Sequence, residues 1–466
     1  MCMLTRLVLC GLLFVATTAH AAPPKLRVTQ DGRHLETEDG KPFFLLADTA
    51  WELFHRLKDD EAELYLKKRA SQGFNTVFAV ALAELDLSVP DAYGNQQLHD
   101  NDPTRPNEAY FARIDAIVQK AGELGLYTGF LPTWGDKWNK QWGKGPEIFT
   151  PENARAYGEW LGKRYAAAPV IWILGGDRSV DTDAHRAIIR AMAEGLRKGD
   201  GGAHLITFHP KGTHNSATYW PDELWLDFHM FQSGHSNAKD KANYKYNLRN
   251  RLLTPAKPTL DGEPRYEDHP VRGIPNGGSK WYDAFDVRQA AWWDLLSGSC
   301  GHTYGDHNIW QMWAPSRRPA FHARTPWREA LEHDGAQQMG YLRTFFEQMD
   351  WQKLEPRDEL LIGDKGDGGS RILAMAKPDG TLAVAYTPHG KPVHVDLRQL
   401  KAWQPDRTLV QGEWFNPRTG KTDGSLTEDS GNWDVSFKPE GSVARGNDWV
   451  LRLRLPSVLR QRDSIR

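Results

Sequence analysis

The chain has 466 residues, which is more than one small domain needs and enough for a β/α barrel with a smaller second domain. Its 58 lysine and arginine residues nearly balance its 60 aspartate and glutamate residues. Such a balance does not create the strong field that attracts nucleic acids or acidic membranes, so neither is expected as a partner. Aromatic residues are frequent, with 19 Trp, 14 Tyr and 18 Phe. They fit either a large core or flat platforms for sugar rings, and composition does not separate these two uses.

Residues 1–21 have the features of a secretory signal peptide. Arg6 gives a positive start, residues 7–15 form an apolar run too short to span a bilayer, and Ala19-His20-Ala21 is a small-x-small cleavage site. We expect cleavage after Ala21 and export from a bacterial cell, to the periplasm or the exterior. Cys2 and Cys10 would leave with this peptide, so Cys300 is expected to be a single buried thiol.

The next segments predict a hairpin and then a repeated alternation of strand and helix. Residues 26–28 and 34–37 flank a turn at Asp31-Gly32, and we expect this hairpin to plug the bottom of a barrel. Short apolar strands are predicted at residues 42–47, 74–80, 126–131, 170–174, 204–208, 226–231, 258–263 and 298–304. Helices are predicted near residues 59–72, 107–124, from 151, 182–197, 240–253, 283–296 and 326–348. Eight strands with helices between them predict an α/β fold, a parallel (β/α)8 TIM barrel over residues 22–353.

The chain changes character after about residue 354. Short strands at 372–375, 382–386, 393–397 and 449–455 are separated by turn signals at 378–380, 388–390 and 417–420. Regular short strands with turns predict a small C-terminal β-sandwich over residues 354–466.

Two acidic residues follow predicted barrel strands. Asp177 comes after the buried strand 170–174 and the pair Gly175-Gly176, and Glu263 ends the seventh strand. The carboxyl ends of barrel strands carry the active site, so both should lie at the barrel mouth. A glycosidase needs one protonated carboxyl group and one ionised carboxylate there. We assign Asp177 as the acid/base and Glu263 as the nucleophile, and the mechanism is retaining if the two groups stand about 5–5.5 Å apart.

Alternatives remain open for both acids. Asp177 could cap the next helix, and Glu263 could form an ion pair with Arg265. Glu267 and Asp261 are rivals for the second role. Other polar and aromatic residues follow strand ends and fit a pocket for a polyol, which needs several hydrogen-bonding groups and an aromatic wall. These predicted substrate-binding residues are Asp48, Trp51, Trp134, Asp136, His209, His229, Gln232, Tyr304 and His307.

A histidine-rich stretch raises the possibility of a metal. His302, Asp306 and His307 could supply three ligands, with His209 or His229 as a fourth. The first strand carries no His-x-His pair, which metal-dependent barrel hydrolases of the amidohydrolase type usually place there. The prediction is therefore no metal, and no cofactor, since no glycine-rich phosphate loop occurs.

Four motifs together resemble glycoside hydrolase family 140, the apiosidase-like bacterial enzymes. They are residues 44–51 (FLLADTAW), 172–177 (WILGGD), 260–267 (LDGEPRYE) and 301–305 (GHTYG). The resemblance implies a (β/α)8 barrel and a retaining mechanism, with the acid/base at Asp177 and the nucleophile at Glu263. Residues 414–420 (WFNPRTG) look like the C-terminal domain labelled "putative collagen-binding", although nothing in them indicates collagen as a ligand.

The family's characterised activity is release of apiose-linked side chains from pectic rhamnogalacturonan II. We therefore expect an exported retaining glycoside hydrolase that acts on plant cell-wall or related polysaccharide. Two alternatives are a catalytically silent carbohydrate-binding barrel and a metal-dependent barrel hydrolase. Substitution of Asp177 by Asn should separate the first from the enzyme, and chelation should inactivate the second. The sugar, the linkage and the oligomeric state stay open.

Overall fold

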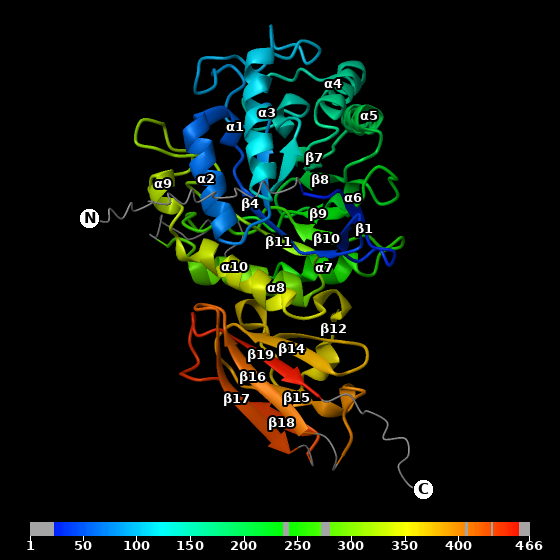
Figure 1. Cartoon of the computed structure of the whole chain (residues 1–466), viewed down its shortest axis with the longest axis vertical. Helices are drawn as coiled ribbons and strands as arrows, with labels where there is room; N and C mark the ends of the chain where they lie inside the picture. The colour runs from blue at the N-terminus through cyan, green and yellow to red at the C-terminus, as the bar shows by residue number, and fades with distance from the viewer. Residues whose placement is uncertain (1–22, 236–241, 272–279, 406–408, 430–431, 456–466) are drawn as a thin grey trace, which may run out of the picture.

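The structure is a computed structural model that describes residues 23–235, 242–271, 280–405, 409–429 and 432–455 (Figure 1). The predicted signal peptide lies outside the described residues, as do the first two residues of the helix predicted near 240–253. None of the helices in the described ranges combines the length and apolar composition that a lipid bilayer crossing requires.

The first part of the chain is the predicted barrel. Its strands are β4 (Leu45–Thr49), β5 (Thr76–Val80), β6 (Tyr127–Leu131), β7 (Val170–Arg178), β8 (Ile206–Pro210), β9 (His229–Phe231), β10 (Thr259–Asp261) and β11 (Gly301–Tyr304). A continuous parallel sheet has the order β11-β4-β5-β6-β7-β8, and β9 pairs in parallel with β10. Backbone hydrogen bonds close the ring, from Asp227 N to the Ile206 carbonyl (2.9 Å) and from Cys300 N to the Thr259 carbonyl (3.0 Å).

Helices surround this ring (Figure 1). They are α1 (Leu53–Arg56), α2 (Asp59–Ser71), α3 (Glu108–Glu123), α4 (Pro151–Arg164), α5 (Asp183–Asp200), α6 (Ser216–Tyr219), α7 (Tyr244–Asn250), α8 (Ala284–Leu296), α9 (Trp327–Ala330) and α10 (Asp334–Glu347). Several begin at side-chain caps, such as Asn107 before α3 and Thr182 before α5, which satisfy backbone N–H groups of the first turn. The single helix predicted over 326–348 is two helices, because His333 is extended between them and its side chain binds Asp306.

Strand residues alternate between the inside of the ring and the helices. Leu45 and Ala47 belong to the inner cluster, together with Ile171, Ile173 and Met230. Their neighbours in β4, including Leu46, point outward to a cluster formed with α8 and α10. This alternation decides which polar side chains at the strand ends can reach a shared cavity.

The N-terminal segment covers the amino ends of the barrel strands. β1 (Leu26–Val28), β2 (Leu35–Thr37) and β3 (Pro42–Phe43) form a small antiparallel sheet, in the order β1-β2-β3. Leu26, Leu35 and Phe43 join the inner cluster of the barrel. The predicted hairpin therefore closes the end of the barrel opposite the strand carboxyl ends.

The C-terminal part is antiparallel. Its strands are β12 (Glu355–Pro356), β13 (Leu373–Ala376), β14 (Leu382–Thr387), β15 (Val393–Asp396), β16 (Leu409–Asn416), β17 (Lys421–Asp429), β18 (Asp434–Phe437) and β19 (Trp449–Arg454). One sheet has the order β12-β13-β14-β19-β16-β17, and β15 pairs with β18. Apolar side chains of both sheets, such as Ala385, Val395 and Leu451, form one core. The sandwich-like prediction is thereby confirmed.

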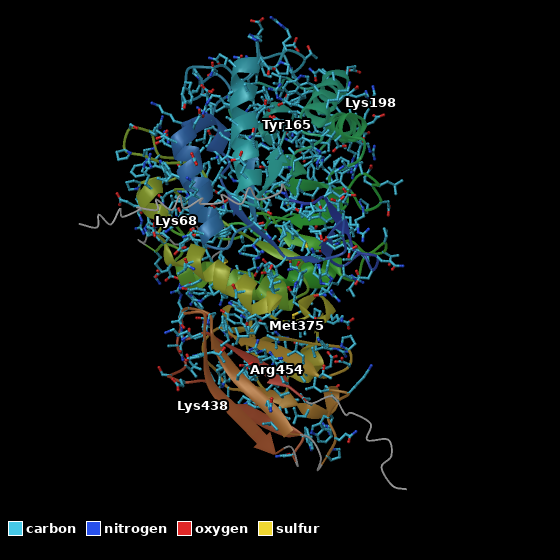
Figure 2. The ribbon with its side chains drawn as sticks, viewed as in Figure 1. Lys68, Tyr165, Lys198, Met375, Lys438 and Arg454 are labelled. Atoms are coloured by element: carbon cyan, nitrogen blue, oxygen red, sulfur yellow. The ribbon has the colours of Figure 1, made fainter. Side chains whose placement is uncertain are left out.

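The two parts share a buried interface below α8 and α10 (Figure 1). Arg288 of α8 donates two hydrogen bonds to Asp448, at 2.7 and 2.6 Å, and both side chains are buried. Trp292 stacks on Tyr386 with ring centroids 5.9 Å apart. Met375 lies in the same apolar cluster, and Figure 2 labels it at the boundary between the two parts. The second domain thus packs on the side of the barrel.

Candidate active site

Asp177 is placed at the barrel mouth by an irregularity at the end of β7. Gly175 pairs with His209, and Arg178 pairs with Pro210, so two residues of β7 have no counterpart in β8. The extra residues, Gly176 and Asp177, bulge out of the sheet. Bulges of this kind redirect a side chain, and here the redirected side chain is a carboxyl group.

The glycine pair is sterically required. Gly175, Gly176 and Asp177 have φ angles of 96°, 90° and 55°, all in the left-handed region. A β-carbon at Gly175 would lie 2.3 Å from the His209 carbonyl oxygen, and one at Gly176 would lie 2.6 Å from Gly135 N. Only glycine fits both positions, so the Gly-Gly-Asp sequence is what allows the acid to occupy this site.

Glu263 approaches the same place from the loop after β10. The backbone there is tied to β9, since Gly262 N donates to the Phe231 carbonyl at 2.8 Å and Gly234 N donates to the Glu263 carbonyl at 2.9 Å. The Glu263 side chain is 9% exposed. Its Oε1 lies 2.8 Å from His235 Nε2, and its Oε2 lies 3.2 Å from His209 Nε2.

One imidazole connects the two acids. The backbone N–H of Asp177 donates to His209 Nδ1 at 3.1 Å, so that nitrogen is an acceptor. The ring proton of a neutral His209 is therefore on Nε2, the atom that faces Glu263. Asp177 Oδ1 accepts a hydrogen bond from Gly212 N at 3.2 Å, and its Oδ2 lies 3.5 Å from Arg178 Nη1. The structure thus brings Asp177, Glu263 and His209 together.

The surroundings shift the two carboxyl groups in opposite directions. Burial, followed by the negative charge of Glu263, raises the pKa of Asp177 above its ordinary value. Burial acts the same way on Glu263, but the adjacent imidazoles of His209 and His235 outweigh it and hold the pKa of that carboxylate below its ordinary value. The pair can therefore carry one proton donor and one ionised carboxylate at the same pH.

Aromatic side chains form one wall beside the acids. Trp51 and Trp134 lie with ring centroids 5.4 Å apart, and each lies within 6 Å of the His209 ring, at 5.5 and 5.9 Å. Trp51 Nε1 donates to the hydroxyl oxygen of Tyr266 at 3.1 Å. The Tyr266 ring lies 4.2 Å from the ring of His235. The predicted aromatic residues Trp51 and Trp134 thus lie against His209, the residue between the two acids.

Asp48 and Tyr304, predicted to bind substrate, face away from the barrel interior. Asp48 accepts hydrogen bonds from Arg69 Nε (2.6 Å) and from the Tyr65 hydroxyl (2.7 Å), and all three side chains are buried. The Tyr304 hydroxyl donates to Glu267 Oε2 at 2.7 Å. Both predicted residues lie on the outer side of their strands, so they support the packing of the helices.

Two further predicted residues are also engaged elsewhere. Asp136 binds Lys137 Nζ at 2.5 Å and accepts from Gly145 N at 2.8 Å, with both charged side chains buried. His229 points outward from β9 to Ser216 Oγ, 3.5 Å away, and burial lowers its pKa to about 4. These interactions fix loops and helices around the barrel, and neither side chain joins the two acids.

Gln232 and His307 lie at the margin of the site. Gln232 Oε1 is buried without a partner in the described residues, and a β-carbon on Gly212, the residue that binds Asp177, would contact this side chain. His307 Nε2 lies 3.0 Å from the Phe321 carbonyl oxygen, so the ring is held by a loop. It reaches Glu263 only indirectly, through the rings of His269 and His235.

The rival acids have other partners. Asp261 is fully buried beside Ser233, whose Oγ lies 2.6 Å from Asp261 Oδ2, and burial followed by the charge of Asp294 raises its pKa to about 8. Glu267 accepts from Tyr304 and from Gly335 N. Burial raises its pKa to about 7. Among these acids, Glu263 is the one that shares His209 with Asp177.

The three metal ligands considered from sequence do not converge. His302 Nδ1 lies 2.8 Å from Asp294, Asp306 lies 2.6 Å from His333, and His307 faces Phe321. Within the described ranges, Glu267, Asp306 and His333 do approach one another. Burial opposes the charge of His333, but the hydrogen bond to Asp306 raises its pKa to about 9, so a metal ion would have to displace a proton from this ring.

Sequence reasoning missed His235, Tyr266, Glu84 and Arg178 as residues of the site. Arg178 donates from Nη1 to the Asp177 carbonyl at 2.8 Å and lies over the exposed ring of Trp142, 4.3 Å from its centroid. These residues lie beside a predicted acid or in loops, where periodicity gives no signal. Arg178 directly follows Asp177, and this adjacency was the sequence signal that could have predicted its place at the site.

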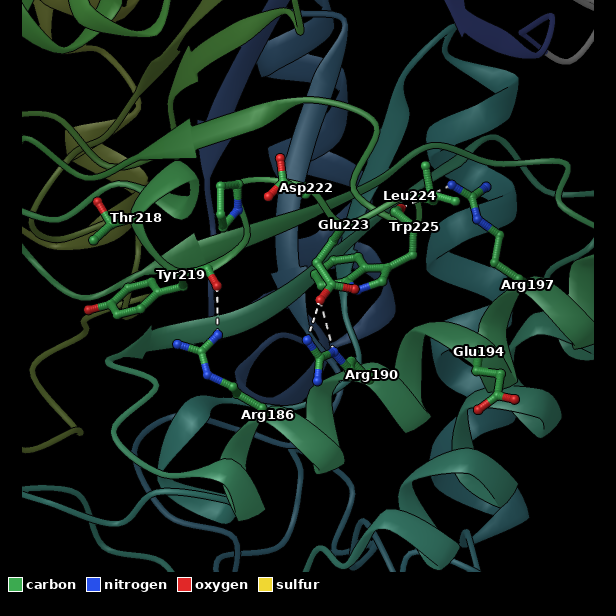
Figure 3. Close-up of a pocket in the computed structure, with 11 residues that line it drawn as sticks. Arg186, Arg190, Glu194, Arg197, Thr218, Tyr219, Asp222, Glu223, Leu224 and Trp225 are labelled. Atoms are coloured by element: carbon green, nitrogen blue, oxygen red, sulfur yellow. Dashed lines mark hydrogen bonds and ion pairs between the residues drawn. The ribbon is translucent and has the colours of Figure 1, made fainter. Parts of the chain in front are cut away.

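A surface groove lies on the outer side of the barrel, between α5 and residues 218–225 (Figure 3). Two of its arginines are already engaged, since Arg190 binds Glu223 at 2.6 Å and Arg186 donates to the Tyr219 carbonyl at 2.7 Å. Neither Asp177 nor Glu263 lines this groove, so it is separate from the acids at the strand ends.

Solved structures similar to this chain define its class. A protein described as a glycoside hydrolase is 30% identical with a TM-score of 0.81, over 92% of this chain and 97% of that one. A glycoside hydrolase family 5 protein from Bacteroides vulgatus ATCC 8482 is also 30% identical, with a TM-score of 0.82, over 92% of this chain and 93% of that one. No curated protein sequence matches. The chain has a glycoside hydrolase fold.

The family follows from two sequence models. "Apiosidase-like, catalytic domain" matches residues 29–353, and "Putative collagen-binding domain of a collagenase" matches residues 356–454. The chain belongs to the apiosidase-like family. Together with the fold, this membership supports a glycosidase whose substrate is a carbohydrate.

Proposed function

We propose that this chain is a retaining glycoside hydrolase that cleaves glycosidic bonds in plant cell-wall (pectic) or related polysaccharide. The supporting observation is that Asp177 and Glu263 share His209 and have pKa values shifted apart. A pair of carboxyl groups tuned this way supplies the acid and the nucleophile of a double displacement. The apiosidase-like family supports a substrate that carries apiose, and the pectic source is part of the proposal.

In the first step, the protonated Asp177 gives its proton to the glycosidic oxygen while Glu263 attacks the anomeric carbon. The bond to the leaving sugar breaks, and a covalent glycosyl-enzyme forms. In the second step, Asp177 takes a proton from water, the water oxygen attacks the anomeric carbon, and Glu263 leaves as a carboxylate. The His209 and His235 contacts orient Glu263 and keep it ionised between turnovers.

The proposal also includes export. It rests on residues 6–21, which have the charge, apolar run and cleavage site of a secretory signal. N-terminal sequencing of the protein made with these residues in a bacterial host should give Ala22 as the first residue. An intact N-terminus in the cytoplasm would contradict export.

The test of activity compares wild type, Asp177→Asn and Asp181→Asn on pectic oligosaccharides and aryl glycosides. Asp181 is an exposed carboxylate four residues away, bound by Asn139 and Gln141, and serves as the matched control. We expect Asp177→Asn to lower kcat on unactivated sugars by about 10²–10⁴-fold, the usual contribution of a general acid. With aryl glycosides that carry good leaving groups, Asp177→Asn should slow the glycosylation step far less, because these groups depart without being protonated.

A silent carbohydrate-binding barrel gives a different result. In that case the wild type releases no sugar from the panel, and Asp177→Asn binds the same glycans with unchanged affinity. Loss of activity in Asp181→Asn equal to the loss in Asp177→Asn would also contradict the assigned role.

A further inference from the structure

Glu84 is a third carboxyl group beside the two acids. It lies in the loop after β5, and its Oε2 is buried without a hydrogen-bond partner among the residues that the structure describes. Burial, followed by the negative charges of Glu52, Glu263 and Asp177, raises its pKa well above the ordinary value, while Arg178 acts in the opposite direction. The loop leaves the carboxyl end of β5, and its anchor Lys137 lies two residues after Gly135, which packs against Gly176 and Arg178 on either side of Asp177. This carboxyl group therefore lies at the same end of the barrel as the two acids.

The loop holds Glu84 in place from both sides. Ala83 N donates to Gln97 Oε1 at 2.7 Å, and Lys137 Nζ donates to the Ala83 carbonyl at 3.0 Å. Leu85 N donates to Glu52 Oε1 at 3.1 Å. The side chain between these anchors is thus presented by a fixed backbone.

Glu52, the neighbouring acid, shows what a structural carboxylate looks like in this region. Its Oε1 binds Leu85 N and its Oε2 lies 2.8 Å from His55 Nδ1, so both oxygens are engaged. Glu84 lacks such a partner for Oε2. Buried polar groups in native proteins are nearly always hydrogen-bonded, because an unpaired one lowers stability. A group left unpaired beside an active site fits a ligand as its missing partner.

We propose that Glu84 is a substrate-binding residue, whose carboxyl group pairs with a hydroxyl group of the sugar held between Asp177 and Glu263. The inference rests on the proposed glycosidase function and extends it. The neutral carboxyl group can donate one hydrogen bond and accept another, which matches a sugar hydroxyl. It also adds no negative charge that would raise the pKa of the nucleophile Glu263.

The experiment uses Glu84→Ala, Glu84→Gln and the control Asp86→Asn in the full chain. Asp86 lies in the same loop, and its carboxylate is bound by the Ser88 backbone and hydroxyl at 2.9 and 2.6 Å. On a glycoside that the wild type cleaves, we expect Glu84→Ala to lower kcat/KM by about 10- to 100-fold. Glu84→Gln, which keeps a donor and an acceptor, should have a kcat/KM within about fivefold of wild type. The control Asp86→Asn should have the kcat/KM of wild type.

Two further measurements distinguish substrate binding from a structural role. The thermal unfolding midpoint of Glu84→Ala should equal or exceed that of wild type, because the substitution removes an unpaired buried carboxyl group. With deoxy analogues of the same glycoside, the one lacking the contacted hydroxyl should react at the same rate with wild type and Glu84→Ala.

Wild-type kcat/KM in Glu84→Ala would overturn the inference and leave the glycosidase proposal intact. A marked fall in its unfolding midpoint would also overturn it, by assigning Glu84 to the scaffold. A wild-type chain that cleaves no glycoside of the panel would overturn the glycosidase proposal and this inference with it.

Discussion

The opposed pKa shifts of the two acids predict the pH profile of kcat/KM. Asp177 must be protonated to serve as the acid, so activity is lost as pH rises through its pKa of about 6. Glu263 must be ionised, so activity is lost as pH falls through its pKa of about 2. The profile should therefore be a bell on the acidic side of neutrality. Above the upper pKa each pH unit lowers the protonated fraction tenfold, which leaves roughly one hundredth of the plateau at pH 8.

The assay measures kcat/KM from pH 3 to pH 9 on an oligosaccharide whose leaving sugar needs protonation. Each point is paired with recovery of full activity after return to pH 5, which excludes denaturation. The alkaline limb should disappear in Asp177→Asn, because the asparagine side chain has no proton to lose in this pH range. An unchanged alkaline limb in Asp177→Asn, or a wild-type profile that stays flat to pH 9, would refute the assignment of Asp177 as the proton donor.

Three other substitutions test the surroundings. His235→Ala removes the 2.8 Å partner of Glu263 Oε1 and should lower kcat/KM by about 10- to 100-fold while shifting the acidic limb upward into the range measured above pH 3; a profile that stays level down to pH 3 would contradict its role. Arg69→Met leaves Asp48 buried without its counter-charge and should lower the free energy of unfolding in urea by about 3–5 kcal/mol, with KM unchanged in the folded fraction. Asp261 has a folded pKa of about 8, raised above the unfolded value near 4, so its stability contribution is present below pH 4 and is lost as pH rises toward 8. Asp261→Asn should remove this slope and gain about 3 kcal/mol relative to wild type between pH 5 and pH 7, at about 1.36 kcal/mol per pH unit; parallel stability curves would contradict it.

The position of Asp177 could be predicted from the sequence, because the residue types around it indicate both an acid and a sharp turn of the backbone. A strand buried on both faces, followed by two glycines and an acid, predicts a sharp change of direction at the strand end. The structure shows why, since no β-carbon fits at Gly175 or Gly176. The alternation of strands and helices likewise predicted the barrel, which the fold confirms.

The face of each strand could not be predicted the same way. Barrel strands are apolar on both sides, so their pattern does not reveal which residues point inward. Asp48 and Tyr304 follow the apolar runs as expected, but they point toward the helices. A shift of one residue exchanges the two faces, and only the closed ring fixes that choice.

Loop residues posed a different problem. His235 and Glu84 carry no periodic signal, and their neighbours in space come from other strands. His235 meets Glu263 across 28 residues of sequence, and Glu84 reaches the same end of the barrel from the loop after β5. Contacts of this kind depend on the register of the whole barrel.

The identity of the nucleophile is the central claim, and a trapped intermediate tests it most directly. The enzyme would be incubated with an activated 2-fluoro glycoside of the sugar that it releases, digested, and its peptides mapped by mass spectrometry. The glycosyl group should be attached to Glu263. Attachment to Glu267 or Asp261, or no covalent adduct together with an inverted anomeric product, would contradict the mechanism.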